Sequence, residues 1–444
     1  NFSHGTHESH AAVIQRLRDA AAHSPRPLAI LQDLSGPKVR VGDLPGGSVT
    51  LRRGQCVRFV PEARGEPDSI PLPAPPLLEA LSPGDRLLAD DGRLELRVTE
   101  RAGDSVLARV VVGGPLASRK GITAPGVEFP IAAVTAKDLE DLRFGLAQGV
   151  DWVAASYVRG PEDILPLRRV MEEVGVRRPI IAKIEKQEAI RRIDSILGAV
   201  EGIMVARGDL GVEIPVDQVP LVQKRIIALC SRAGRPVITA TQMLESMIQN
   251  SRPTRAEVTD VANAILDGTD AVMLSGETAV GQHPLEAVRM MARVASNVDP
   301  CLPDRPAFAA RQAASPSVTE AVAQATVEMA RVLRAAAILC ATTSGSTARL
   351  IAKYRPDTPV VAVTPFEETW RQLALTWGVR PLLIPPVRTT DEMMDATIAA
   401  AVTRGIARPG DRVILTAGVP VNVAGNTNLI KVHQVGLDEG ARGG

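Results

Sequence analysis

Charged and hydroxyl side chains end several apolar runs of this 444-residue sequence. In IIAKIE, Lys183 and Glu185 are two residues apart, so on a strand both side chains would point to the same face. Asp209 follows Gly208 in ARGDLGVEIP, and Thr241 ends PVITATQ. An ammonium, two carboxylates and a hydroxyl brought together would suit phosphoryl transfer, because that reaction depends mainly on positioning and charge neutralisation.

The two carboxylates also predict a metal site. Glu185 and Asp209 would supply two oxygen ligands for a hard divalent cation, and Mg²⁺ usually takes only one or two protein carboxylates. We expect Gly208 and Asp209 at the amino end of a short helical turn, where backbone N–H groups can hold an anion. Taken singly, KIE could be a salt-bridged strand end and RGD a solvated loop. The prediction therefore depends on several strand ends meeting at one place.

Six apolar runs of strand length would position these side chains. They are residues 28–33, 152–158, 179–185, 202–209, 236–242 and 271–277. Helical patterns such as AKDLEDLRFGLAQ and PLVQKRIIALCSRA separate them, which is typical of βα units whose catalytic groups lie at the carboxyl ends of the strands. No GxGxxG turn follows any of the runs, so the pattern favours an α/β fold of the TIM (β/α)8-type barrel over an open dinucleotide-binding sheet.

Two further domains are predicted. Residues 41–129 are rich in Gly, Pro and β-branched residues, and the turn signals DDGR and RAGD indicate an inserted antiparallel β-barrel lid domain on the catalytic face. Residues 301–444 carry a separate α/β pattern. The barrel would then comprise residues 1–40 and 130–300.

Composition narrows the class of partner. The chain has 51 Lys and Arg against 50 Asp and Glu, which predicts no nucleic acid and no membrane surface as partner. The four cysteines are far apart, so neither a zinc site nor a disulfide framework is expected. No apolar run reaches the roughly 18 residues of a membrane span. We expect a soluble cytoplasmic protein with a small substrate.

Two further patterns allow two interpretations each. His4, His7 and His10 recur every three residues and could form a metal cluster, but we favour the helix surface for the latter two. Hydroxyls precede a predicted helix in ATTSGSTARLIAKYRP and could form an anion site or a simple helix cap. The residues of this loop are Thr342, Thr343, Ser344, Gly345, Ser346 and Thr347.

The motifs NFSHG, GPKVR, IIAKIE, MVARGDLGVEIP, ATQMLESMI and AVMLSGETAVGQHP resemble, in the same order, those of the pyruvate kinase family. The resemblance implies a cytoplasmic glycolytic phosphotransferase that converts phosphoenolpyruvate and ADP to pyruvate and ATP. It also implies Mg²⁺ or Mn²⁺ as cofactor, an allosteric C-terminal regulatory domain and a homotetramer. By resemblance Lys183 is catalytic, Glu185 and Asp209 bind the metal, and Lys183, Gly208, Asp209 and Thr241 bind the substrate. Thr241 would relay a proton to the enolate through water.

The resemblance assigns the remaining sites as well. Four residues match nucleotide-binding positions: Asn1, His4, Arg40 and Lys120. Four match the family's monovalent-cation site: Asn1, Ser3, Asp33 and Leu34, the last through its backbone. Lys38 stands where members that need potassium have glutamate, so its ammonium is expected to replace K⁺, unless it points to solvent. The loop 342–347 matches the family's effector site, for which a phosphorylated sugar or AMP is expected.

One departure and two alternatives remain. The family's first barrel strand and helix, with a phosphate-binding arginine before NFSHG, are absent from this numbering, so we expect a piece of a longer chain with the barrel one strand short. The alternative enzyme is another Mg-dependent barrel enzyme acting on phosphoenolpyruvate or a 2-oxo acid. The alternative from another class is a regulatory binding protein that has lost catalysis.

Overall fold

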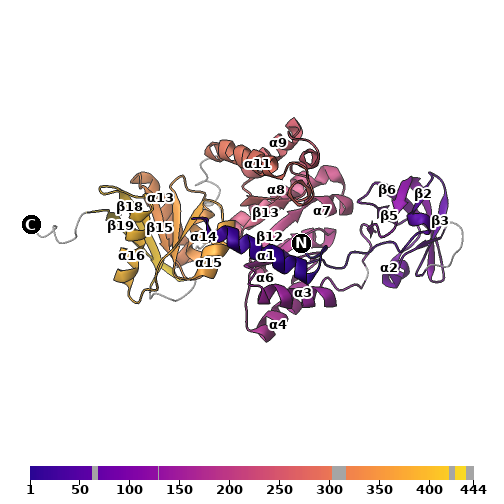
Figure 1. The fold of residues 1–444 in the computed structure, drawn as a ribbon, viewed down its shortest axis with the longest axis horizontal. Helices are drawn as coiled ribbons and strands as arrows, with labels where there is room; N and C mark the ends of the chain where they lie inside the picture. The colour runs from indigo at the N-terminus through magenta and orange to yellow at the C-terminus, as the bar shows by residue number, and fades with distance from the viewer. Residues whose placement is uncertain (63–68, 129, 303–316, 420–425, 437–444) are drawn as a thin grey trace, which may run out of the picture.

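The computed structural model describes residues 1–62, 69–128, 130–302, 317–419 and 426–436. The predicted boundary at 129/130 and the start of the predicted C-terminal domain therefore lie partly outside the described residues. Three parts follow one another along the long axis, with the parallel sheet in the middle, the inserted β domain at one end and the C-terminal domain at the other (Figure 1). Within the described ranges, no helix is long and apolar enough to cross a membrane.

The central sheet has six parallel strands, in the order β1-β10-β11-β12-β13-β14. They are β1 (Leu31–Asp33), β10 (Trp152–Ala155), β11 (Ile180–Ile184), β12 (Gly202–Ala206), β13 (Val237–Ala240) and β14 (Ala271–Val272). Each strand lies within one of the six predicted apolar runs. A barrel one strand short would have seven strands, whereas six strands pair in the central sheet of the described residues.

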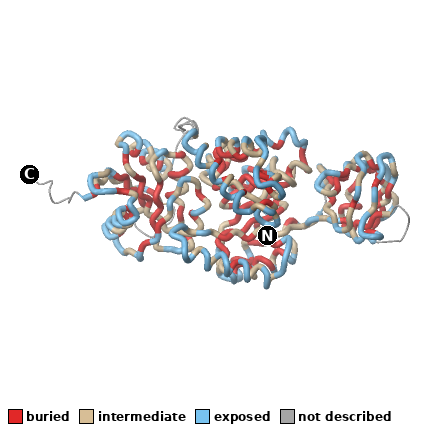
Figure 2. Tube along the Cα trace, turned by 45° about the horizontal axis from the view of Figure 1, so that its top comes forward, coloured by how far each residue is buried: buried red, intermediate tan, exposed pale blue. Residues whose placement is uncertain are grey.

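Helices connect and cover these strands. They are α1 (His7–Ala22), α3 (Ala136–Ala147), α4 (Leu165–Val174), α5 (Gln187–Arg191), α6 (Ile193–Ala199), α7 (Arg207–Glu213), α8 (Val219–Ala233), α9 (Arg255–Asp267), α10 (Gly276–Ala279) and α11 (Pro284–Val298). Thr6, Thr135 and Thr254 begin three of them by accepting backbone N–H groups, and Gly234 ends α8 in the left-handed region. The buried apolar residues of the core belong to both the strands and the helices. Figure 2 shows the buried residues gathered in the interior of each part.

The inserted β domain folds around its own core. Its elements are β2 (Ser48–Leu51), β3 (Cys56–Val60), β4 (Ser69–Pro71), α2 (Pro75–Ala80), β5 (Arg86–Ala89), β6 (Leu94–Ala102), β7 (Ser105–Val112), β8 (Gly114–Ala117) and β9 (Ile122–Thr123). The order β4-β3-β7-β6-β5-β9 is antiparallel except between β3 and β4, so the prediction of a purely antiparallel domain is wrong for that pair. A chain segment containing α2 connects β4 to β5.

The C-terminal domain is a sheet with helices on it. Its elements are α13 (Val318–Val332), β15 (Ala337–Ala341), α14 (Ser346–Ala352), β16 (Val360–Thr364), α15 (Glu367–Gln372), β17 (Val379–Leu383), α16 (Thr390–Thr403), β18 (Arg412–Gly418) and β19 (Thr427–Gln434). The strand order is β17-β16-β15-β18-β19, and only β19 is antiparallel. Short 3-10 helices are η1 (Pro45–Gly47), η2 (Pro161–Ile164), η3 (Val216–Gln218), η4 (Glu245–Ile248), η5 (Asp299–Cys301) and η6 (Leu373–Leu375).

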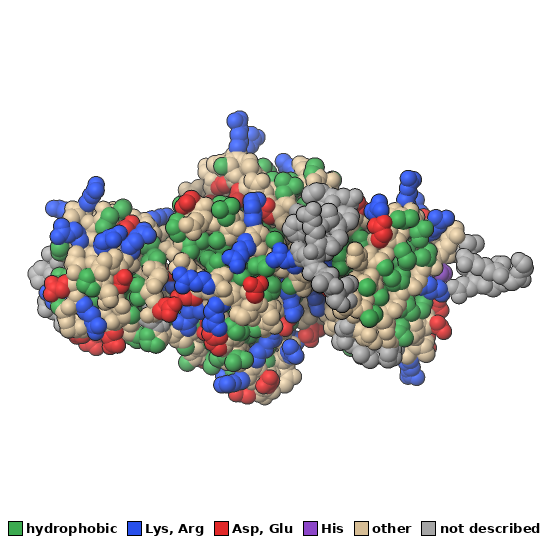
Figure 3. Space-filling model, turned by 180° about the vertical axis from the view of Figure 1, so that it is seen from behind, with side chains coloured by type: hydrophobic (Ala, Val, Ile, Leu, Met, Phe, Trp, Pro, Cys, Tyr) green, Lys and Arg blue, Asp and Glu red, His purple; other side chains and the backbone are tan. Residues whose placement is uncertain are grey.

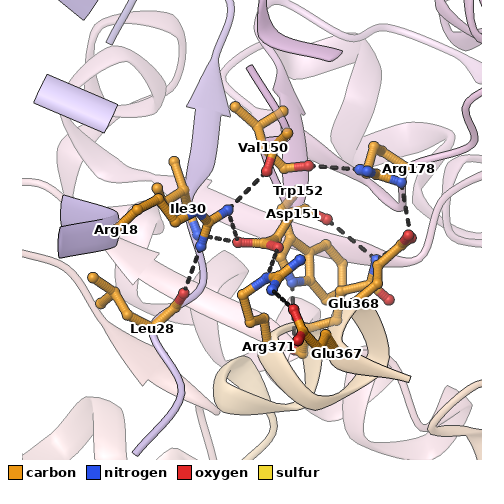
Figure 4. Close-up of polar contacts among 12 residues, drawn as sticks. Arg18, Leu28, Ile30, Val150, Asp151, Trp152, Arg178, Glu367, Glu368 and Arg371 are labelled. Carbon is orange, nitrogen blue, oxygen red and sulfur yellow. Dashed lines mark hydrogen bonds and ion pairs between the residues drawn. The ribbon is translucent and has the colours of Figure 1, made fainter. Parts of the chain in front are cut away.

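A buried carboxylate joins the C-terminal domain to the barrel (Figure 4). Asp151, just before β10, is paired with Arg18 of α1 and Arg371 of α15, each at 2.8 Å. Beside it, the indole Nε1 of Trp152 donates to the carbonyl oxygen of Gln372 at 3.3 Å. The amino end of β10 is thereby connected to α15.

Basic and acidic side chains are interspersed over all three parts on the face that Figure 3 shows. This distribution agrees with the formal net charge of +1. That face therefore presents no broad surface of one charge.

Candidate active site

Lys183 lies on β11 in a ring of polar groups at the carboxyl end of the sheet. Its Nζ is 3.1 Å from Asp33 Oδ1, 3.1 Å from Glu185 Oε1 and 2.8 Å from Ser156 Oγ. Burial alone would lower the pKa of Lys183, but the carboxylates of Glu185 and Asp33 outweigh it and raise the pKa above its usual value. The side chain therefore carries a fixed positive charge inside the site.

Glu185 is 1% exposed and follows directly after β11, and its contact with Lys183 agrees with the predicted placement of both side chains on one face. Its Oε2 accepts the backbone N–H of Tyr157 at 2.7 Å. Burial raises the pKa of Glu185 to about 7, Lys183 opposes that rise, and the negative charge of Asp209 adds to it. The negative charge of Asp209 close to the Glu185 carboxyl fits a divalent cation, because the cation would relieve the repulsion between the two groups.

Gly208 and Asp209 lie in the first turn of α7, the short helix that the sequence predicts after β12. Thr241 follows β13 with a φ of 67°, a left-handed conformation that is rare for a β-branched residue. Its Oγ1 accepts the N–H of Gly208 at 2.8 Å, and its carbonyl accepts Nη2 of Arg207 at 2.7 Å. Arg207 in turn binds both oxygens of Asp260, at 2.8 and 2.7 Å. These contacts hold the strained residue beside α7.

A cavity lies between this end of the barrel and the inserted β domain. Six of its lining residues are Lys38, Asp91, Tyr157, Lys186, Asp209 and Glu213. The barrel contributes the candidate metal-binding carboxylates, and the inserted domain contributes Asp91 and its neighbours. A substrate held there would contact both parts.

Sequence reasoning missed two residues that contact the site directly. Ser156 donates to the carbonyl of Leu34 at 2.7 Å and accepts from Lys183. Tyr157 has a φ of 56° and gives its backbone N–H to Glu185. Both follow β10 within the predicted run 152–158, so the rule that strands end in functional residues could have found them.

The expected monovalent-cation residues lie together beside Lys183. Asn1 Oδ1 accepts the N–H of Ser3 at 2.9 Å, and the N–H of Phe2 donates to the Asp33 carbonyl at 2.8 Å. Lys38 takes a different direction, with its Nζ 3.9 Å from Asp91 Oδ1 of the inserted domain. In this structure the cation that pairs with Asp33 is Lys183 rather than Lys38.

The four expected nucleotide-binding residues are not among those that line the cavity. Lys120 Nζ is 2.6 Å from Asp90 Oδ1, and Arg40 Nη1 donates to the Arg119 carbonyl at 3.0 Å. His4 is exposed at the start of the chain.

His7 and His10 lie on α1 and are partly exposed, as we expect for the helix surface, and each side chain also makes specific contacts. His7 Nε2 is 2.8 Å from Asp141 Oδ1, and its ring stacks on Phe144 with the ring centres 4.2 Å apart. His10 stacks on Phe2 at 4.0 Å. No group of three or more metal-binding side chains occurs within the residues that the structure describes, so these histidines form no metal cluster there.

The loop 342–347 precedes α14, as the sequence predicts. Gly345, which has no side chain, is the N-cap residue of this helix. Thr342 Oγ1 accepts the N–H of Gly345 at 2.9 Å, and Ser344 Oγ is 3.1 Å from Ser346 Oγ. The carbonyl oxygen of Thr343 accepts a hydrogen bond from the hydroxyl of Thr369 on α15, at 2.7 Å.

Comparison with known proteins identifies the relatives of this chain. The family model "Pyruvate kinase, barrel domain" matches residues 1–288, and "Pyruvate kinase, alpha/beta domain" matches residues 320–433. The predicted fold class is thereby confirmed.

Three bacterial proteins are similar over nearly the whole chain. Pyruvate kinase of Geobacillus stearothermophilus is 46% identical over 440 residues, covering 98% of this chain and 75% of the relative. Pyruvate kinase 2 of Synechocystis sp. is 47% identical over 440 residues, with 98% and 74% covered. Pyruvate kinase of Staphylococcus epidermidis is 44% identical over 447 residues, with 100% and 76% covered. The chain belongs to the pyruvate kinase family.

Proposed function

We propose that this protein transfers the phosphoryl group of phosphoenolpyruvate to ADP and releases pyruvate and ATP. The observation that carries the proposal is the ammonium of Lys183, whose side chain is 13% exposed and which lies 3.1 Å from a carboxylate oxygen of Asp33 and of Glu185. Such a fixed charge is placed to stabilise the negative charge of a phosphoryl group in transfer and of the enolate that remains. The kinase relatives support the same reaction.

The carboxylates of Glu185 and Asp209 would hold Mg²⁺ or Mn²⁺. When bound, the cation would neutralise phosphate and enolate oxygens. Gly208, Asp209 and Thr241 would receive the substrate carboxylate at the start of α7. Because Thr241 Oγ1 accepts the Gly208 N–H, its own proton can be donated into the site, which supports Thr241 as the proton relay through water.

Around this centre we propose the finer assignments. Asn1, His4, Arg40 and Lys120 would bind the nucleotide, after Lys120 exchanges Asp90 for a phosphate. Lys38 would take the place of K⁺ once the inserted domain moves, since its present partner Asp91 lies 3.9 Å away, at the weak end of ion pairing.

The oligomeric state and the allosteric regulation of the protein are also proposals. Four apolar side chains on the barrel helices support a homotetramer because they are more than half exposed: Val216, Leu221, Leu285 and Val288. The loop 342–347 would bind a phosphorylated sugar or AMP. Calorimetry with ribose 5-phosphate, glucose 6-phosphate, AMP and fructose 1,6-bisphosphate tests it, and four blank titrations would remove the effector role. The cytoplasm is the proposed location.

Dependence on ADP distinguishes this function from that of the alternative enzyme. We expect the protein to form pyruvate from phosphoenolpyruvate only when ADP and a divalent cation are both present. The lactate dehydrogenase-coupled assay measures this directly. Pyruvate release without ADP, or cleavage of a 2-oxo acid, would favour another Mg-dependent barrel enzyme.

A further inference from the structure

Two chain segments connect the inserted β domain to the barrel, one after β1 and one before α3 (Figure 1). The first connection is residues 34–40, and the described part of the second is residues 124–128 and 130–134. They lie beside each other at the domain end, where the N–H of Ile122 donates to the Val39 carbonyl at 3.0 Å. A movement of the inserted domain against the barrel must therefore displace one or both connections.

The loop after β10 contacts both connections. Ser156 Oγ donates to the Leu34 carbonyl in the first connection at 2.7 Å. Arg159 Nη2 donates to the Ile131 carbonyl in the second connection at 2.8 Å. The loop is therefore placed to respond when either connection is displaced.

Tyr157, between these two residues, packs its ring against the first connection. A Cβ atom added to Gly36 would lie 2.6 Å from Cδ2 of the ring, closer than two non-bonded carbon atoms can approach. Gly36 also has a φ of 66°, so glycine is required there both for its backbone and for its lack of a side chain. The ring lies within cation–π range of Lys186, whose Nζ is 5.9 Å from the ring centre. The position of the ring thus depends on that of the first connection.

The same loop holds the two charged groups of the candidate active site. The Ser156 hydroxyl accepts from Lys183 Nζ at 2.8 Å, and the Tyr157 backbone N–H donates to Glu185 Oε2 at 2.7 Å. Two neighbouring residues therefore each contact both the first connection and a charged residue of the site.

The backbone of Tyr157 is strained, with a φ of 56°. A left-handed conformation is costly for a residue other than glycine and persists only where its surroundings enforce it. The contacts of the ring with Gly36 and Lys186 supply that enforcement. If the ring moved, the peptide that donates to Glu185 would move with it.

We propose that Tyr157 is a positioning residue that couples the first connection of the inserted domain to Glu185 and so to divalent-cation binding. This coupling rests on the proposed function, in which Glu185 and Asp209 hold the cation. Gly36 sets the position of the Tyr157 ring, the ring holds the left-handed backbone, and the backbone N–H orients Glu185. Loss of a hydrogen bond that orients a metal ligand commonly weakens metal binding by about tenfold to a hundredfold.

Coupling of this kind acts in both directions, because linkage between two sites is reciprocal. A displacement of the first connection changes the affinity of the cation site, and cation binding restrains the first connection. The amide of Gly36, which donates to Asp138 Oδ1 at 3.0 Å, reports on that connection.

Calorimetry with Mn²⁺ in the absence of substrates tests the proposal on the full chain, with circular dichroism to establish that each variant is folded. Tyr157→Ala should weaken Mn²⁺ binding by about tenfold, because the backbone N–H loses the support of the ring. Tyr157→Phe keeps the ring and should bind Mn²⁺ as wild type does. Gly36→Ala should also weaken binding, and should have little further effect in the Tyr157→Ala background, where its closest contact is gone.

Gly126→Ala is the matched control. Gly126 lies in the second connection with a φ of 78°, and a Cβ atom there would meet no described atom within 4 Å. The substitution strains the backbone as Gly36→Ala does, without pressing on Tyr157, and should leave Mn²⁺ affinity near that of wild type. Hydrogen exchange is a second readout: Mn²⁺ should slow exchange at residues 34–40 in wild type and Tyr157→Phe, but not in Tyr157→Ala.

Unchanged Mn²⁺ affinity in Tyr157→Ala would overturn the proposal. Equal effects of Gly36→Ala and Gly126→Ala would do the same, as would strictly additive effects of Gly36→Ala and Tyr157→Ala. Exchange at residues 34–40 that does not respond to Mn²⁺ in wild type would contradict the coupling even if a variant does not fold. A wild type that binds no Mn²⁺ would refute the metal site of the proposed function, and this coupling with it.

Discussion

Asp151→Asn removes the charge that joins the C-terminal domain to the barrel while keeping the volume of the side chain. Asp151 is 1% exposed, and it accepts Arg371 Nε at 2.8 Å, Arg18 Nη2 at 2.8 Å and the Ile30 N–H at 2.8 Å. An asparagine has one acceptor oxygen and no charge. It would therefore leave at least one arginine without its partner and would turn an amide N–H₂ towards that arginine.

The size of the effect follows from these contacts. Removing one partner of a buried ion pair costs about 3–5 kcal/mol. Both arginine side chains are 24% exposed, so water relieves part of the loss. We expect the free energy of unfolding to fall by about 3 kcal/mol.

Urea denaturation followed by tryptophan fluorescence measures this loss, because Trp152 Nε1 contacts the carbonyl of Gln372 across the same boundary. The control is Arg143→Gln, which removes a surface pair with Glu173 whose side chains are 49% and 60% exposed, and should cost less than about 1 kcal/mol. Asp151→Asn and Arg371→Gln should cost less together than the sum of their separate effects. A loss below about 1 kcal/mol for Asp151→Asn, or strict additivity, would refute the reasoning.

Three further outcomes follow from the site. Because burial raises the pKa of Glu185 to about 7, Mn²⁺ affinity measured by calorimetry should rise as pH increases towards about 7 and level off above it; a pH-independent affinity would contradict this. Asp209→Asn should sharply raise the Mg²⁺ concentration needed for half-maximal activity, and an unchanged value would remove Asp209 from the metal site. Wild type should be active without K⁺ or NH₄⁺ and Lys38→Glu should acquire a K⁺ requirement, whereas a silent wild type that K⁺ revives would refute the role of Lys38.

The raised pKa of Glu185 also makes the stability of the folded protein depend on pH. The folded-state pKa is raised above the unfolded value, so the protonated carboxyl is favoured in the folded protein. The stability that it contributes is present below the unfolded-state pKa and is lost as pH rises through about 7 in the metal-free chain. Divalent cation should restore it above that pH, because the cation binds the ionised carboxylate of the folded state alone.

The strands and their polar ends could be predicted because each depends on local sequence. Alternation alone predicts that Lys183 on β11 and Glu185 directly after it point to the same side, and a glycine with a short helical turn predicts Asp209 nearby. The position of the loop before α14 could likewise be predicted from its hydroxyl residues and from the helical pattern after it.

The remaining features depend on contacts between segments that are far apart in the sequence. The local sequence pattern does not indicate such contacts. The carboxylate of Asp151 meets residues 133 positions before it and 220 positions after it. The parallel pairing of β3 with β4 leaves the alternation of side chains within each strand unchanged, so the local sequence pattern does not show it. Lys38 could not be placed because its ion-pair partner, Asp91 at 3.9 Å, lies in another domain.

The central claim is that the Lys183 ammonium promotes phosphoryl transfer. The most direct measurement is pyruvate formation from phosphoenolpyruvate, ADP and Mg²⁺ by Lys183→Met, with Lys224→Met, which removes a surface charge on α8, as matched control. Circular dichroism would establish that both variants are folded. Lys183→Met should lower kcat by at least about a hundredfold to a thousandfold, because the charge acts chiefly on the transition state, while Lys224→Met stays near wild type. Near-normal turnover by folded Lys183→Met would contradict the account.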